Sequence, residues 1–245
     1  MSFRIEHDSR IDEISKRLLA RRQEISVNIY DALTYLSESW HPHPSWHQHG
    51  KLEFALLHHT LYEAQQASVA EDEARVELAL RAWEAFPEPP SIVLDMSLGA
   101  VLVVDSQNCQ STEDDRFDST PYTINEPTLQ SDSEVPREFV YASIEHVTRS
   151  NVASYLEAEL GVIVILKKLP VGSVTTGYSL TGFPGTVFTD WTENSVRLGE
   201  SLLHESTHSW LNECISLFGE DLSTEETWYS PWKKCMRPAF GIIHA

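Results

Sequence analysis

Residues 9–86 carry three stretches in which apolar residues recur at helical spacing. From Ser9 to about Ser37 they follow steps of three, four and seven residues, which predicts a long amphipathic helix. Segments 52–67 and 73–86 repeat this period and predict two more helices, the second of which ends before a run of prolines. We interpret residues 1–90 as a helical N-terminal region that covers the core or shapes a substrate groove, and we assign no chemical role to its side chains.

Beyond residue 90 the pattern changes to short apolar runs that favour strands. Residues 92–94 and 100–104 are rich in β-branched and other apolar side chains, which predicts two strands. Residues 162–166 are apolar without alternation, which is typical of a strand buried on both faces. Residues 139–160 have a helical period and predict one helix, with Gly161 as its left-handed C-cap.

Two segments are predicted to be loops. Gln107–Pro136 is acidic and poor in apolar residues, as expected for a long loop or lid. His41–Gly50 contains two prolines and four histidines, which could bind a metal ion adventitiously. A solvated connection between helices is the favoured interpretation of this second segment, because no carboxylate or cysteine within it completes a metal site.

The segment Leu202–His208 contains the motif H-E-x-x-H within a long amphipathic stretch that predicts a helix. Because residues four apart lie on one helical face, the imidazoles of His204 and His208 can hold one cation. Glu205 is placed to move a proton beside that cation. The chain thus predicts an α+β fold: an N-terminal helical layer, followed in residues 91–245 by a mixed α/β region whose small sheet packs against the motif helix.

A metal site needs more than two imidazoles, and further candidates lie around the motif. Glu225 and Glu226 are spaced from the motif like the downstream glutamate ligand of some zinc peptidases, with a solvated acidic turn as the alternative. His244 is a third candidate ligand near the C-terminus. Glu200, one turn before His204, could orient that imidazole, and an ordinary solvated glutamate is an equal alternative.

Composition narrows the class of protein. The 245 residues carry a formal net charge of −19, which argues against nucleic acid as a partner because a phosphate backbone attracts Lys and Arg. Cys109, Cys214 and Cys235 are odd in number and lack C-x-x-C spacing, which favours a reducing, cytoplasmic environment. The N-terminus lacks an apolar signal core, and no apolar run is long enough to span a membrane. We therefore expect a cytoplasmic protein without a membrane partner.

The last third of the chain, roughly residues 175–245, resembles a known family. The features that carry the resemblance are Phe183-Pro184-Gly185, the motif helix, Trp228-Tyr229-Ser230-Pro231-Trp232, Arg237-Pro238 and Gly241-Ile242-Ile243-His244. Together they are similar to the HEXXH-motif peptide-modification family, whose members accompany ribosomally made, modified peptides. Members of this family are implicated as iron- and 2-oxoglutarate-dependent peptide hydroxylases.

The resemblance implies a site and a reaction. His204, His208 and His244 would hold Fe(II), and Arg237 would pair with a carboxylate of 2-oxoglutarate. The substrate would be a precursor peptide that gains a side-chain hydroxyl, with Glu205 as a further ligand or an orienting group. Two alternatives stay open: a zinc metallopeptidase that uses Zn(II), Glu225 or Glu226 and Glu205 as general base, and a non-catalytic peptide-binding partner.

The chain departs from the family at its end. Family members usually continue past the histidine that corresponds to His244, whereas here only one residue, Ala245, follows that histidine in the sequence. A strand that stops at its metal ligand is poorly anchored. The expectations are a shortened member, a second protein chain that completes the fold, or a member that has lost activity.

Overall fold

The structure is a computed structural model that describes residues 9–38, 40–87, 92–95, 99–111, 120–149, 153–218, 227–230 and 235–238. Of residues 9–12, 92–95, 153, 218, 227–230 and 235–238 only the backbone is described. The elements in chain order are α1 (Ser9–Leu36), η1 (Pro44–Gln48), α2 (Gly50–Val69), α3 (Glu73–Arg81), β1 (Ile92–Asp95), β2 (Gly99–Asp105), η2 (Ser106–Asn108), β3 (Gln110–Ser111), β4 (Tyr122–Thr123), α4 (Glu126–Leu129), α5 (Arg137–Thr148), α6 (Ala153–Glu159), β5 (Val162–Lys168), β6 (Gly177–Tyr178), β7 (Thr186–Trp191), α7 (Ser195–Phe218), β8 (Thr227–Ser230) and β9 (Cys235–Pro238).

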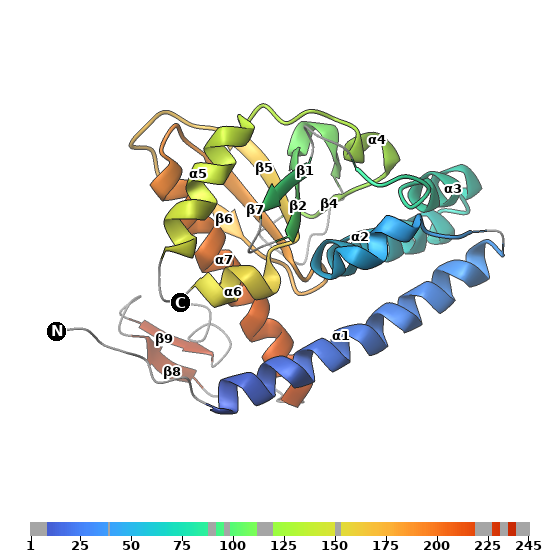
Figure 1. Cartoon of the computed structure of the whole chain (residues 1–245), viewed down its shortest axis with the longest axis horizontal. Helices are drawn as coiled ribbons and strands as arrows, with labels where there is room; N and C mark the ends of the chain where they lie inside the picture. The colour runs from blue at the N-terminus through green and yellow to red at the C-terminus, as the bar shows by residue number, and fades with distance from the viewer. Residues whose placement is uncertain are drawn as a thin grey trace.

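A mixed sheet with the strand order β1-β2-β5-β7-β6 lies between two layers of helices. Its central strands β2, β5 and β7 are parallel, and β1 and β6 pair antiparallel with them at the two edges. Helix α2 covers one face of the sheet while α5, α6 and α7 cover the other, and α1 runs along the outer side of α2 (Figure 1). This arrangement confirms the predicted α+β fold, with an N-terminal helical layer and a small sheet packed against the motif helix α7.

The strands alternate between two core clusters, one on each face of the sheet. In β2, Leu102 and Val104 join the cluster that contains α1 and α2 residues, while Val101 and Val103 join the cluster under α5 and α7. All four side chains are at most 2 % exposed. Burial on both faces explains why these strands are continuous apolar runs without alternation, as predicted for residues 162–166 in β5. The first cluster combines residues from both sides of the predicted domain boundary near residue 90. The boundary itself stays a prediction.

The helix predicted over residues 73–86 is wrong at its end, because α3 stops at Arg81. The next residues form tight turns, with the amide of Trp83 donating to the carbonyl of Leu80 at 3.2 Å. The turns direct the fully buried indole of Trp83 against Trp46, with ring centroids 4.7 Å apart, and its Nε1 donates to Oγ1 of Thr60 at 3.0 Å. Aromatic packing therefore ends this helix before the prolines do.

The single helix predicted over residues 139–160 is also wrong, because α5 ends at Thr148 and α6 begins at Ala153. Val147 and Leu156 both enter the cluster under α7, yet on one continuous helix nine residues make about 2.5 turns and place side chains on opposite faces. Gly161 is not in the left-handed region. A Cβ at this position would lie 2.7 Å from the carbonyl oxygen of Lys51, so the glycine serves a close approach between β5 and α2.

The predicted lid over residues 107–136 is corrected in its described part. Strands β3 and β4 pair antiparallel, and α4 follows them. Ile124, Leu129 and Val135 are at most 4 % exposed, so the segment packs against the core on a few well-spaced apolar residues. Residues 112–119 lie outside the described part of the chain.

Candidate functional site

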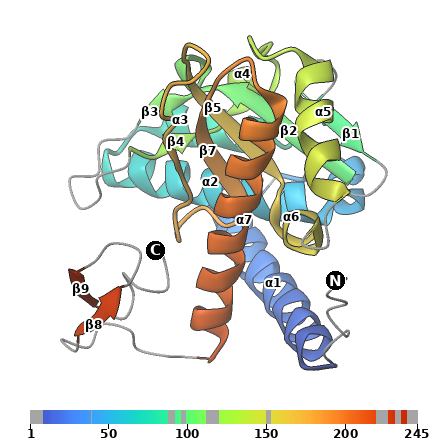
Figure 2. The same cartoon turned by 90° about the vertical axis from the view of Figure 1, so that its left-hand side faces the viewer.

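The motif helix α7 is fixed to the sheet by its first turns. Asn194 caps it, since its Oδ1 accepts from the amide of Arg197 at 3.2 Å. Leu198 and Leu202 are fully or almost fully buried against the sheet. A Cβ at Gly199 would lie 2.6 Å from the carbonyl oxygen of Ser143, so a glycine allows α7 to cross close to α5 (Figure 2).

The Phe183-Pro184-Gly185 turn contacts the middle of the same helix. Gly185 has a φ of 75°, and its amide donates to Oγ of Ser209 at 3.2 Å. Phe183 is 2 % exposed and stacks on the ring of His59 at a centroid distance of 4.4 Å. The turn therefore joins the sheet, α2 and the motif helix immediately after His208.

His204 and His208 lie side by side on α7, as the four-residue spacing requires. Their Nε2 atoms are 3.0 Å apart, and the rings meet edge to face with centroids 4.5 Å apart. A metal–imidazole bond is about 2.1 Å long, so one cation can bridge two nitrogens at this separation. The side chain of His204 is 61 % exposed, which leaves the pair accessible from solvent. The two imidazoles thus fit a shared metal ion, and their role as ligands stays a prediction.

Glu205 is buried, unlike its neighbour His204. It is 6 % exposed, and its Oε1 lies so close to β6 that a Cβ at Gly177 would come within 3.3 Å of it. Burial raises the pKa of Glu205 to about 7, against the opposing effect of hydrogen bonds from the hydroxyl and the amide of Ser179. Its Oε1 is 3.9 Å from Nε2 of His204. Glu205 is therefore a partly desolvated carboxyl group beside the imidazole pair.

The other predicted ligands fall outside what the structure describes. His244, Glu225 and Glu226 lie in residues 219–226 and 239–245, which are not described. Arg237 pairs with Trp228 in the β8–β9 hairpin, where only the backbone is described. Among the described side chains, no group of three His, Cys, Asp or Glu residues could hold a metal ion.

Glu200 is a solvated glutamate in the structure, which is one of the two alternatives predicted for it. Arg197 donates to Oε2 of Glu200 at 3.2 Å, and both side chains are more than half exposed. Arg197 is one turn before Glu200, so the pair is an ordinary contact along the helix surface.

Three of the four histidines of residues 41–50 have separate structural contacts. Nδ1 of His43 accepts from the amide of Ser45 at 3.2 Å at the start of η1. His47 lies 2.9 Å from a carboxylate oxygen of Glu53, and His49 stacks on the ring of Phe86 at 4.6 Å. These contacts favour the interpretation of this segment as a connection between helices.

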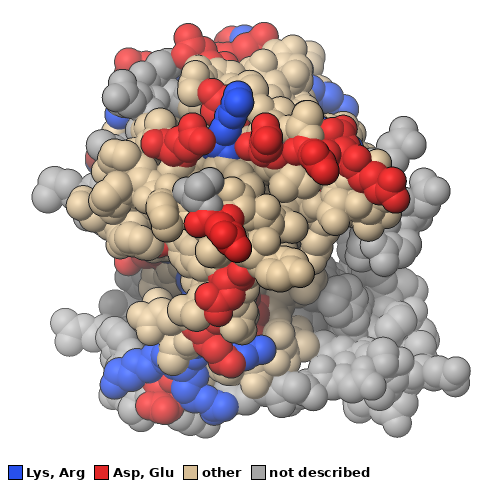
Figure 3. Space-filling model, turned by 90° about the vertical axis from the view of Figure 1, so that its right-hand side faces the viewer, with Lys and Arg blue, Asp and Glu red and all other residues tan. Residues whose placement is uncertain are grey.

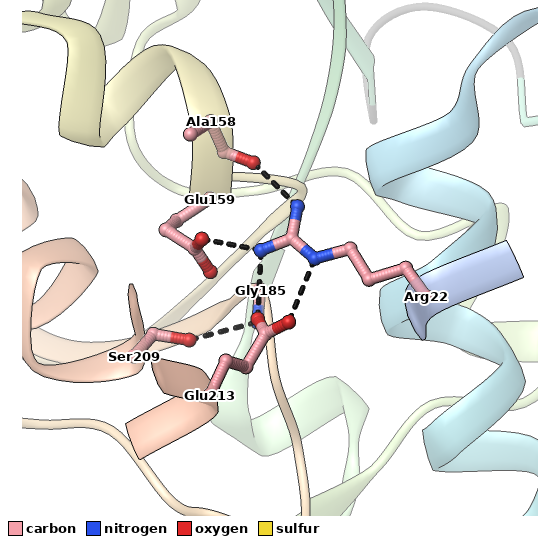
Figure 4. Close-up of polar contacts among 6 residues, drawn as sticks. All are labelled: Arg22, Ala158, Glu159, Gly185, Ser209 and Glu213. Atoms are coloured by element: carbon pink, nitrogen blue, oxygen red, sulfur yellow. Dashed lines mark hydrogen bonds and ion pairs between the residues drawn. The ribbon is translucent and has the colours of Figure 1, made fainter. Parts of the chain in front are cut away.

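A buried ion cluster of Arg22, Glu159 and Glu213 was missed by the sequence analysis (Figure 4). Arg22 reaches from α1 to α7, where its Nε and Nη2 donate to the two carboxylate oxygens of Glu213, each at 2.7 Å. Nη2 also donates to Glu159 at the end of α6, and Nη1 donates to the carbonyl of Ala158 at 2.8 Å. The Arg22, Glu159 and Glu213 side chains are 11 %, 1 % and 16 % exposed.

The sequence does contain one signal for this cluster. Arg22 lies between Leu18 and Ile25 in the apolar stripe of α1, four and three residues away. A cation within such a stripe predicts a buried anionic partner, because an unpaired buried charge is costly. The cluster ties the N-terminal helix to the motif helix, five residues beyond His208.

Comparison with the models of known protein families gives no match for this chain, and no curated protein sequence matches it. What the site can do is therefore argued from its residues and their geometry. None of the described helices combines the length and the apolar character needed to cross a membrane.

Proposed function

We propose that the protein is an Fe(II)- and 2-oxoglutarate-dependent hydroxylase that acts on a side chain of a ribosomally made precursor peptide. The observation that carries the proposal is the pair of imidazoles on α7, whose Nε2 atoms lie 3.0 Å apart and of which His204 has an exposed side chain. Imidazole nitrogens are suitable ligands for iron, and a pair fixed on one rigid helix needs little reorganisation to bind it. The choice of hydroxylation as the reaction depends on the resemblance of residues 175–245 to the HEXXH-motif peptide-modification family.

His204 and His208 would supply two ligands, and His244 is the proposed third. Arg237 would hold 2-oxoglutarate, since its planar guanidinium can donate two parallel hydrogen bonds to a carboxylate. When bound, Fe(II) supplies the oxidation in which the peptide C–H, dioxygen and 2-oxoglutarate become the peptide C–OH, succinate and carbon dioxide. The chain's own task is to place the peptide side chain and the 2-oxoglutarate carboxylates beside the two imidazoles.

Glu205 would hold or move a proton beside this site. Glu205 is 6 % exposed, with Ser179 beside it. With a pKa raised to about 7, both of its protonation states are accessible near neutral pH.

The same property of Glu205 favours one second candidate, a zinc metallopeptidase. In the metal-free chain this carboxyl group has a pKa near 7, and its Oε1 is 3.9 Å from Nε2 of His204, so it is placed to take a proton from a water molecule that attacks a peptide bond. In that enzyme Zn(II) would be held by His204, His208 and either Glu225 or Glu226. The two candidates share two ligands and differ in the product.

One assay separates the candidates. The full chain is incubated in air with a candidate precursor peptide, Fe(II) and 2-oxoglutarate, and in parallel with Zn(II) alone, and the peptide is analysed by mass spectrometry. The hydroxylase predicts the gain of one oxygen atom only when 2-oxoglutarate is present. The peptidase predicts two shorter peptides, and a non-catalytic binding partner predicts an unchanged mass.

A matched pair of variants ties the product to the proposed ligands. His204→Ala removes one imidazole of the pair, while His146→Ala removes an exposed histidine from α5. The oxygen gain is expected to disappear in the first variant and to persist in the second. Equal product from both variants would contradict the proposed site.

A further inference from the structure

A groove of about 950 Å³ lies where the end of α1, the end of α2 and helix α3 meet. These elements are far from the H-E-x-x-H motif in the sequence. The floor of the groove is apolar: the side chains of Trp40 and Leu80 line it and are each 6 % exposed, and Val76 is half-buried beside them. All of its lining residues come from residues 36–84, so the groove shares no residue with the imidazole site.

The rim of the groove is strongly acidic. Glu71, Glu73, Glu77 and Glu84 line it and are exposed. In the part of the chain that the structure describes, none of these four carboxylates forms an ion pair. Acidic side chains form a band over this face of the molecule, whereas Arg81 is the one Lys or Arg among the described lining residues (Figure 3).

One lining side chain at the end of α1 is both apolar and exposed. Leu36 lines the groove and is 41 % exposed, and Val76 on α3 is half-buried. An apolar surface bordered by a polar rim is typical of a site that binds another protein segment.

We propose that this groove binds a basic, amphipathic peptide segment, whose apolar side chains cover Leu36 and Val76 and whose Lys or Arg side chains face the glutamates. Charge complementarity selects this occupant, because the rim offers four carboxylates that form no ion pair with any described residue, in a chain with a net charge of −19. The accessible apolar surface of Leu36 and Val76 favours an amphipathic ligand over a simple cation, since burying this surface supplies affinity that screened surface charges do not. The inference goes beyond the proposed hydroxylation and does not depend on it.

The test uses the full chain without added metal or 2-oxoglutarate. Fluorescence anisotropy is followed with a labelled helical peptide of about 18 residues that has a leucine face and a lysine face. Two comparison peptides carry glutamate for lysine, or serine for leucine. The basic amphipathic peptide is expected to bind at least about tenfold more tightly than either, and its affinity should fall between about 0.05 and 0.5 M salt.

Matched charge reversals locate the site. The double variant Glu73→Lys and Glu77→Lys reverses two rim charges, while Glu145→Lys and Glu157→Lys reverses two exposed charges on α5 and α6. Both change the net charge equally, so a general effect of protein charge would weaken both alike. We expect the rim variant to lose about tenfold or more in affinity and the control to stay within about twofold.

Three results would overturn the proposal. They are no saturable binding of the basic peptide, equal binding of the glutamate peptide, and an equal loss of affinity in the two double variants. A circular dichroism spectrum of each variant shows that it is folded, and the salt dependence and peptide comparison on the unmodified chain stand independently of the variants. Failure here leaves the proposed hydroxylation standing, because the assay contains neither metal nor 2-oxoglutarate.

Discussion

Replacing Arg22 by methionine is expected to destabilise the fold strongly. Methionine keeps much of the aliphatic length but removes the cation that donates to Glu213, Glu159 and Ala158. The Glu159 side chain, 1 % exposed, and the Glu213 side chain, 16 % exposed, would then lose their charge partner. Removing one partner of a buried ion pair costs about 3–5 kcal/mol. We expect about 3 kcal/mol, because Glu159 can take up a proton when its partner is lost.

That proton uptake gives the effect a pH dependence of known sign. Burial raises the pKa of Glu159 above its ordinary value of 4.5, while Arg22 acts in the opposite direction. A carboxyl group whose pKa is higher in the folded state binds more protons there, so its contribution to stability falls as pH rises from 4.5 toward the folded-state pKa. Without Arg22 this folded-state pKa rises further. The loss of stability in the variant should therefore be larger at alkaline than at mildly acidic pH.

Urea denaturation followed by tryptophan fluorescence measures this effect at about pH 5.5 and pH 8.5. The neighbouring Arg21 provides the control, since it pairs with Glu24 on the surface, where the two side chains are 47 % and 62 % exposed. Arg21→Met is expected to cost less than about 1 kcal/mol at either pH. The reasoning is refuted if the two substitutions have the same cost, or if the cost of Arg22→Met is smaller at the higher pH.

Three further predictions concern the elements that hold the motif helix and the core. Gly199→Ala should cost about 1–3 kcal/mol by forcing α7 away from α5, whereas Gly182→Ala, with nothing within 4 Å of its new Cβ, should change the melting temperature little. Asn194→Ala should cost about 1 kcal/mol in urea denaturation, because the amide of the first helical turn loses its acceptor. Trp83→Ala should cost about 3–5 kcal/mol in the same assay, while Val69→Ala, at a side chain 85 % exposed, should cost less than about 0.5 kcal/mol. The packing described for Gly199 or Trp83 would be contradicted if its substitution cost no more than the control, and the cap would be contradicted if Asn194→Ala left the stability unchanged.

The periodicity of the chain predicted the elements whose burial is set by local pattern. Helix α1 agrees with the amphipathic stripe to within one residue, and β5 is the buried strand expected from its unbroken apolar run. The proximity of His204 and His208 was equally predictable, because four-residue spacing on a helix fixes it without any tertiary contact. In each case the prediction depends only on residues that are close together in the sequence.

Contacts between distant segments were not predictable in the same way. Arg22 and Glu159 are 137 positions apart, and nothing near either residue indicates that α1 and α6 meet. The burial of Glu205 likewise depends on β6 and Ser179, which lie next to the motif helix because β6 pairs with β7 in the sheet. The early end of α3 depends on Trp46 from another element. Local propensity favours a longer helix there, and tertiary packing overrides it.

The most direct test of the central claim is the iron content of the purified full chain after anaerobic loading with Fe(II) and desalting. The unmodified protein and His146→Ala are expected to retain about one iron per chain, whereas His204→Ala and His208→Ala should retain little, because each loses one of two nitrogens 3.0 Å apart. Equal iron in all four proteins, or iron in none of them, would contradict a metal site on α7.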